Sequence, residues 1–220
     1  MTNFKSKKSM KNFIKVIVLV LISAFGISKS NAQTIFSLSP YGNILKSGQP
    51  FFPVGFYIDR GTVASYKDRV NEISAGASFN CINVPFVSGN DAEWTTFLDS
   101  CQLKGIYVIT QLNYNSPYIG PVITFKNHPA VMGWSVGDDA DNGYFTVSQL
   151  QDRQDLIKST DPNHVTELSL TGYYLARRLA VNTYLPTADI IGYQCYPITP
   201  LPDYDVTPTN ALTEAYLRIL

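Results

Sequence analysis

The run 128–141 holds the residues whose types and spacing most favour chemistry. It reads HPAVMGWSVGDDAD, so a loop and a proline lead into an apolar strand, and three carboxylates follow within four positions. Barrel enzymes hold their reactive groups at the carboxyl ends of strands, which is where these acids are expected. Because side chains alternate along a strand, Asp138 and Asp139 should face different ways, and only one is expected to be the working acid.

Hydrophobic periodicity predicts the elements that must position these acids. Short apolar runs alternate with amphipathic helical spacing, which is typical of βα units that build a parallel sheet. The expected strands are 51–58, 81–87, 106–112, 131–136, 165–170 and 190–196. The expected helices are 63–73, 91–104, one that begins at the capping-box pair Thr146 and Gln149 and runs to about residue 159, and 212–219.

Six such units predict an α/β fold, an incomplete (β/α)8 TIM barrel. The segment 36–49, with Gly42 and Gly48 at turns, predicts a hairpin that plugs the barrel floor. A closed barrel needs eight units and about 250 residues, whereas 220 − 32 leaves 188 residues here. We therefore expect a barrel truncated at its C-terminal end. An open doubly wound sheet is the alternative, although no glycine-rich phosphate loop follows the first strand.

Residues 1–32 are predicted to be a secretory signal peptide, separate from the barrel fragment at 33–220. Five lysines precede an apolar stretch at 16–27, and Ser30-Asn31-Ala32 supplies a small-residue cleavage pattern. The apolar stretch is shorter than the ~20 residues that span a bilayer, which disfavours a membrane anchor. We expect a secreted or periplasmic protein without stable membrane insertion after cleavage.

The charge balance narrows the expected partners. The predicted signal peptide holds six lysines and no acid, so 17 basic residues fall to 11 against 17 acidic ones, a net charge of −6. That excess argues against nucleic acid and anionic membranes as partners. No cofactor is expected, and no metal site, because no cluster of His, Cys and Asp has ligand spacing. His128 and His164 precede strands, which puts them away from the chemistry.

The three cysteines are too few for a disulfide framework. Cys81 opens a predicted strand and Cys101 ends the helix that follows, so an oxidising compartment would permit one bridge between them. Buried thiols are the default alternative.

Three stretches resemble the clan of (β/α)8 retaining glycoside hydrolases that includes cellulases, mannanases and β-galactosidases. Residues 45–57 resemble the entry to their first barrel strand, 128–141 their fourth strand and 189–198 their sixth. The resemblance implies hydrolysis of O-glycosidic bonds in a poly- or oligosaccharide, so a carbohydrate is the expected partner.

Position by position, the resemblance assigns Asp138 to the family's Asn/Asp site and Asp139 to its acid/base site. At the acid/base site the chain has aspartate where the family has glutamate, so the side chain that carries the carboxyl group is one methylene shorter. The next residue is Ala140, where the family has proline. The family's nucleophile comes from a seventh strand, beyond the six predicted here, and nothing in the resemblance gives that role to Glu167. We expect the full-length parent to be the enzyme and this chain to be inactive alone.

Aromatic and amide side chains near strand ends favour a sugar ligand, because rings stack on pyranose faces and amides hydrogen-bond hydroxyl groups. The expected substrate-binding residues are Asp138, Tyr57, Gln111, Asn113, Trp134, Gln194 and Tyr196. Packing inside the barrel is the alternative for the aromatic residues, and for Trp134 it is the stronger one.

Two other functions stay open. A barrel that kept its aromatic residues and lost its acid pair would be a secreted carbohydrate-binding protein without catalysis. Residues 133–137 also match the serine-hydrolase pattern Gly-x-Ser-x-Gly, and Asp161 and His164 follow in the right order. That pattern needs a sharp turn into a helix, whereas Gly137 leads into acids, so Ser135 is favoured as an ordinary strand residue.

Overall fold

The computed structural model describes residues 34–58, 60–76, 78–114, 118–170 and 182–193. These ranges belong to the unit Gln33–Leu220. The predicted signal peptide and the predicted last helix lie outside them, and so does Cys195. In the described part of the chain, every helix is too short or too polar to cross a bilayer.

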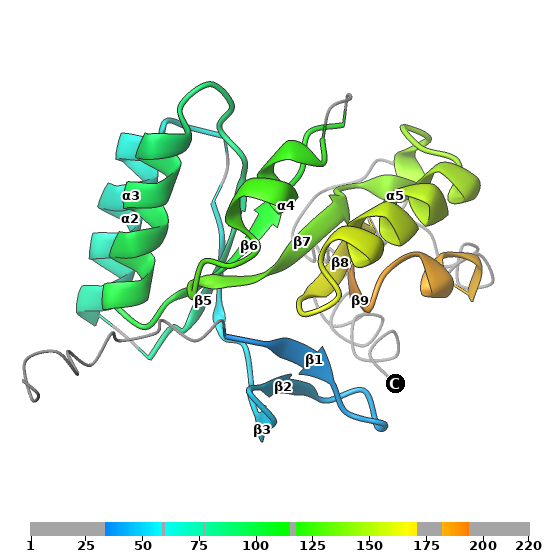
Figure 1. Cartoon of the computed structure of the whole chain (residues 1–220), viewed down its shortest axis with the longest axis horizontal. Helices are drawn as coiled ribbons and strands as arrows, with labels where there is room; N and C mark the ends of the chain where they lie inside the picture. Colours follow the sequence, from blue (N-terminus) through cyan, green and yellow to red (C-terminus); the bar gives the residue numbers. More distant parts are fainter. Residues whose placement is uncertain (1–33, 59, 77, 115–117, 171–181, 194–220) are drawn as a thin grey trace, which may run out of the picture. The chain divides into compact units, whose positions relative to one another are not determined.

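Six parallel strands form the main sheet (Figure 1). They are β4 (Gly55–Tyr57), β5 (Cys81–Pro85), β6 (Tyr107–Gln111), β7 (Val131–Gly137), β8 (Val165–Leu170) and β9 (Ile190–Tyr193). Each strand pairs with the next one in the chain, so the spatial order is the sequence order. A doubly wound sheet reverses its order at a switch point, so that alternative is wrong for these strands. The curled sheet with consecutive order is consistent with an incomplete α/β barrel.

Helices cover one face of this sheet (Figure 1). They are α2 (Val63–Gly76), α3 (Asp91–Leu103), α4 (Gly120–Phe125) and α5 (Val147–Thr160), with the short 3-10 turns η1 (Ala140–Asn142) and η3 (Leu185–Thr187). The predicted capping box is confirmed, because Thr146 Oγ1 accepts from Gln149 N and the Gln149 side chain accepts from Thr146 N. The cap of α3 is Asn90, one residue before the predicted Asp91. Helix α4, which starts on Gly120-Pro121, was not predicted.

The predicted floor hairpin is present as the antiparallel strands β1 (Phe36–Leu38), β2 (Ile44–Lys46) and β3 (Gln49–Pro50). Phe36 packs with Met132 and Val165, and its ring lies 5.0 Å from that of Tyr107, the first residue of β6. Lys46 Nζ donates to Tyr107 Oη at 3.1 Å. The hairpin therefore closes the end of the sheet at which the strands begin, as predicted.

Cys81 and Cys101 are both free thiols in the structure. Burial raises the pKa of Cys81 to about 11 and that of Cys101 to about 12. Both thiols therefore stay protonated and unreactive at neutral pH, which matches the buried-thiol alternative.

Candidate functional site at the strand ends

Polar side chains collect on the face of the sheet that the helices do not cover. On β8, Leu168 and Leu170 pack in the helix-side core and Val165 packs on the hairpin, so alternation puts Glu167 on the hairpin side. Gln111 pairs in register with Ser135, and Ser135 pairs with Glu167. Together with a neighbour on β5, they form what we call the inner arc, which consists of Asn83, Gln111, Ser135 and Glu167.

Glu167 carries the carboxyl group of this arc, and only 9% of its surface is exposed. Its Oε2 accepts from Asn83 Nδ2 at 3.4 Å, and it hydrogen-bonds Ser135. Burial raises the pKa of Glu167 to about 7, the hydrogen bond with Ser135 opposes that rise, and the negative charge of Asp138 adds to it. A Cβ atom on Gly192 would lie only 3.2 Å from Glu167 Oε1, so β9 leaves room for the carboxyl group by having glycine there.

The predicted acid run leaves the sheet through an irregular strand end. The pairing of β7 with β8 shifts between Ser135 and Gly137, and such a bulge re-aims the residues beside it. Asp139 then adopts a left-handed backbone with φ of 49°, and its carbonyl accepts from Asn142 N at 2.9 Å to start η1. Aspartate tolerates this conformation, but it is strained, and such strain concentrates at functional sites.

Tyr114 ties the neighbouring loop to the acid run. Its Oη donates to the backbone carbonyl of Asp138 at 2.8 Å, and its ring lies 5.2 Å from that of Phe145. Burial raises the pKa of Tyr114 to about 12, and the charge of Asp138 adds to that rise. The phenol therefore stays a hydrogen-bond donor across the physiological range.

Arg153 of α5 hydrogen-bonds both the end of β7 and the loop that follows β6, from the helix side of the sheet. Its guanidinium donates to the carbonyls of Val136 at 2.9 Å, Asn113 at 3.1 Å and Tyr114 at 3.5 Å. It also lies 3.9 Å from the centre of the Tyr118 ring. Burial lowers its pKa from the ordinary value. Sequence reasoning missed it because a helical arginine usually faces solvent. The available signal was its spacing, since Arg153 follows Leu150 by three residues and precedes Ile157 by four, which puts it on the same buried helix face.

We predict that Arg153→Met lowers the free energy of unfolding by about 3 kcal/mol, because three carbonyl groups lose a charged donor. Urea unfolding followed by circular dichroism measures the loss. Arg69→Met is the matched control, since Arg69 makes only an exposed pair with Glu72 within α2 and should change stability little. A loss no larger than that of the control would contradict this role of Arg153.

The structure brings part of the predicted substrate-binding set together. Tyr57 is 51% exposed at the end of β4, and its Oη donates to Gln111 Oε1 at 3.5 Å. The side chain of Asn113 is exposed, while its carbonyl accepts from Arg153. Gln194 and Tyr196 lie outside the described residues.

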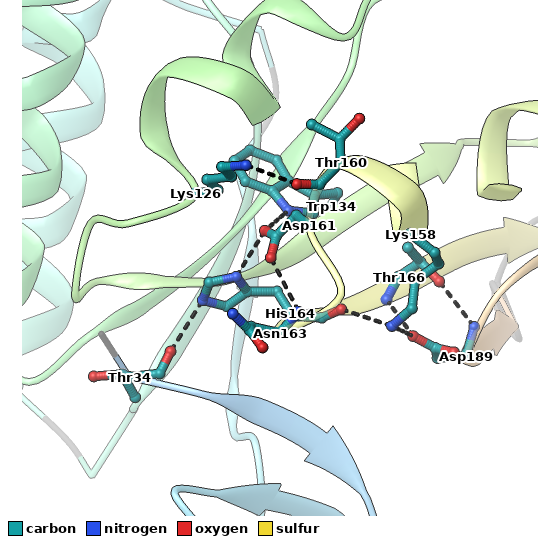
Figure 2. A network of polar contacts seen from close by, with 10 residues as sticks. All are labelled: Thr34, Lys126, Trp134, Lys158, Thr160, Asp161, Asn163, His164, Thr166 and Asp189. Atoms are coloured by element: carbon teal, nitrogen blue, oxygen red, sulfur yellow. Dashed lines mark hydrogen bonds and ion pairs between the residues drawn. The ribbon is translucent and has the colours of Figure 1, made fainter. Parts of the chain in front are cut away.

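Trp134 requires a correction, because it is fully buried on the helix side of the sheet. Its Nε1 donates to Asp161 Oδ2 at 2.7 Å in the network drawn in Figure 2. The β6–β7 pairing shifts near residue 131, which turns the indole toward the helices. Trp134 is therefore a core residue, with no ring face left for a sugar to stack on, so its substrate-binding assignment is wrong and the packing alternative holds.

The serine-hydrolase alternative also fails on geometry. His164 Nδ1 contacts Asp161 Oδ2 at 2.7 Å, and its Nε2 contacts the carbonyl of Thr34 at 3.0 Å (Figure 2). Both ring nitrogens are thus engaged away from Ser135, whose Oγ lies 3.5 Å from the carbonyl of Gly137. A serine nucleophile needs its histidine within hydrogen-bond reach. Among the described residues, no group of three or more His, Cys, Asp or Glu side chains is placed to hold a metal ion.

The protein belongs to the class of α/β folds of the barrel type. This follows from the parallel sheet and the helices that cover it, with acids at the strand ends. No family model matches the chain, and no curated protein matches it in sequence. Solved structures with the same fold include a glycoside hydrolase family 2 member from Bacteroides cellulosilyticus, with a TM-score of 0.54 and 18% identity over 73% of this chain. They also include β-glucuronidase 3 of Bacteroides uniformis (0.53, 15%, 74%) and the β-glucuronidase of Parabacteroides merdae (0.52, 13%, 85%).

Because the identities are this low, the structural likeness shows a shared fold alone. The chain spans about a quarter of the length of these proteins, namely 24%, 23% and 26%.

Proposed function

We propose that this chain is the acid-bearing part of a retaining glycoside hydrolase barrel, and that its full-length parent hydrolyses O-glycosidic bonds in an oligo- or polysaccharide. Asp139 is the proposed acid/base, and Tyr57, Gln111, Asn113 and Asp138 are proposed to bind the sugar. The observation that carries the proposal is the strained, left-handed Asp139 directly after the bulged end of β7. Its acid-rich strand end is where barrel enzymes keep their chemistry.

The fold shared with glycoside hydrolases supports this proposal. The proposal includes export, with residues 1–32 as the signal peptide, and leaves the nucleophile to a strand that follows β9. The alternative function is that of a secreted barrel that binds glycans without cleaving them, and the experiment must distinguish it from hydrolysis.

The test is an assay of the full-length parent on a panel of aryl glycosides. We expect Asp139→Asn to lower kcat/KM at least about a hundredfold, the usual contribution of a positioned acid or base. Asp141→Asn, two residues further along the same turn, is the control and should keep most of the activity. Hydrolysis that survives Asp139→Asn would remove Asp139 from the mechanism, and glycan binding without hydrolysis would favour the non-catalytic barrel.

A further inference from the structure

The proposed mechanism makes no use of Glu167, although it is the carboxyl group of the inner arc and is held there by its neighbours. Ser135 of β7 and Asn83 of β5 hydrogen-bond it, and Gly192 of β9 leaves its Oε1 uncrowded by a side chain. The negative charge of Asp138, beyond the end of β7, acts on Glu167 and raises its pKa further. Two neighbouring carboxyl groups in a buried setting cannot both ionise without cost.

A second observation concerns Asn83 itself. Its Nδ2 donates to Glu167, while its Oδ1 is buried and has no hydrogen-bond partner among the described residues. A buried acceptor of this kind costs free energy until a donor reaches it. Asn83 Oδ1, the Glu167 carboxyl group and the Asp138 carboxylate are all acceptors, so the matching ligand group carries donors and positive charge.

We propose that Asn83, Asp138 and Glu167 form a cation-binding subsite that takes the primary ammonium group of an amino sugar. An ammonium group offers three donors and no acceptor, which suits these three partners. Tyr57 and Gln111, whose side chains hydrogen-bond each other at 3.5 Å, are proposed to contact hydroxyl groups of the same ligand. The inference rests on the proposed function for the location of the site, and it narrows the ligand class from any sugar to one with a basic nitrogen.

Proton linkage follows from this arrangement. The pKa of about 7 means that Glu167 is largely protonated at pH 6 and largely ionised at pH 8. A cation binds the ionised form, so its apparent affinity scales with the ionised fraction. Affinity for the amine should therefore rise about tenfold between pH 6 and pH 8.

The experiment measures binding to the full chain by titration calorimetry at both pH values. The probe is methyl 6-amino-6-deoxyglucopyranoside, whose primary ammonium group stays largely charged over this range. Methyl glucopyranoside, with a hydroxyl group in place of the amine, is the neutral comparison and should show less than a twofold change. Glu167→Gln should abolish the rise in amine affinity between pH 6 and pH 8. Asp152→Asn, on the exposed side of α5, also removes one negative charge and should leave that rise unchanged.

The inference would be overturned if the amine does not bind, if its affinity does not rise between pH 6 and pH 8, or if that rise persists in Glu167→Gln. Circular dichroism of Glu167→Gln excludes misfolding as the cause of a lost rise. The two proposals fail separately. If the parent hydrolyses aryl glycosides but amine affinity does not change with pH, only the subsite proposal is wrong. If amine affinity changes with pH but no glycoside is hydrolysed, the subsite proposal holds and the hydrolase proposal is wrong.

Discussion

Asp161→Ala should cost about 4 kcal/mol of unfolding free energy, because its buried carboxylate is shared by three donors. Asp161 Oδ2 accepts from Trp134 Nε1 and contacts His164 Nδ1, both at 2.7 Å, and its Oδ1 accepts from Asn163 N at 3.1 Å (Figure 2). Alanine would leave a buried indole, a buried imidazole and a backbone amide without their shared acceptor. Urea unfolding monitored by tryptophan fluorescence measures the cost.

The control for this change is Asp155→Ala on the exposed side of α5, where the carboxylate only accepts from Gln151. It should change stability little. A cost for Asp161→Ala below about 1 kcal/mol, the net value of one ordinary hydrogen bond, would show that the network contributes no more than a surface contact.

Asp161 also gives stability a pH dependence. Burial pushes its pKa upward, but the hydrogen bonds from His164 and Trp134 outweigh that effect, and the net pKa is lowered. A carboxyl group with a depressed folded pKa stabilises the fold above its unfolded pKa, and that stability is lost as the pH falls through the folded pKa. Acid therefore weakens the contact between β7, β8 and the hairpin, and Asp161→Asn should remove this contribution to acid unfolding.

Glu167→Gln should stabilise the protein, and more so as the pH rises. The folded pKa of about 7 lies above the ordinary 4.5, so the folded state binds more protons than the unfolded state between these values. Stability of the unaltered protein must then fall as the pH rises from about 4.5 to 7 and level off above it. The difference between variant and unaltered protein should grow to about 3 kcal/mol by pH 8.

Urea unfolding at a series of pH values from 5 to 8 measures this difference. Glu72→Gln, in the exposed pair with Arg69, is the control and should reproduce the pH profile of the unaltered protein. A gain from Glu167→Gln that stays constant across the series would contradict ionisation of Glu167 as its cause. A carboxyl group kept at such a cost is typical of sites where stability is given up for function.

The sheet could be predicted from the sequence because each strand is a short apolar run between clear turn and helix signals. The capping pair Thr146 and Gln149 and the floor hairpin were readable for the same reason, since their geometry depends on local residues. The orientation of Trp134 was not readable. Period-two alternation predicts a face only while the register is regular, and β7 shifts register against both of its neighbours.

The candidate site was predictable only in part. Asp138 and Asp139 were found because three acids follow one strand, whereas Glu167 is a single acid inside an apolar strand and gains its environment from β5, β7 and β9. Arg153 and Tyr114 act through backbone carbonyls that are distant in sequence, and no local pattern reports such partners.

The consecutive strand order also has a consequence for the order in which the elements can form during synthesis. Each strand pairs with the one made just before it, so pairing can advance while the chain is still emerging from the ribosome. The hairpin is the exception, because Phe36 N donates to Asn163 O and His164 reaches the Thr34 carbonyl across 130 positions. The hairpin can contact Tyr107 and Met132 as soon as β6 and β7 have formed, but its backbone hydrogen bonds at Phe36 and Thr34 are complete only when residues 163 and 164 have been made.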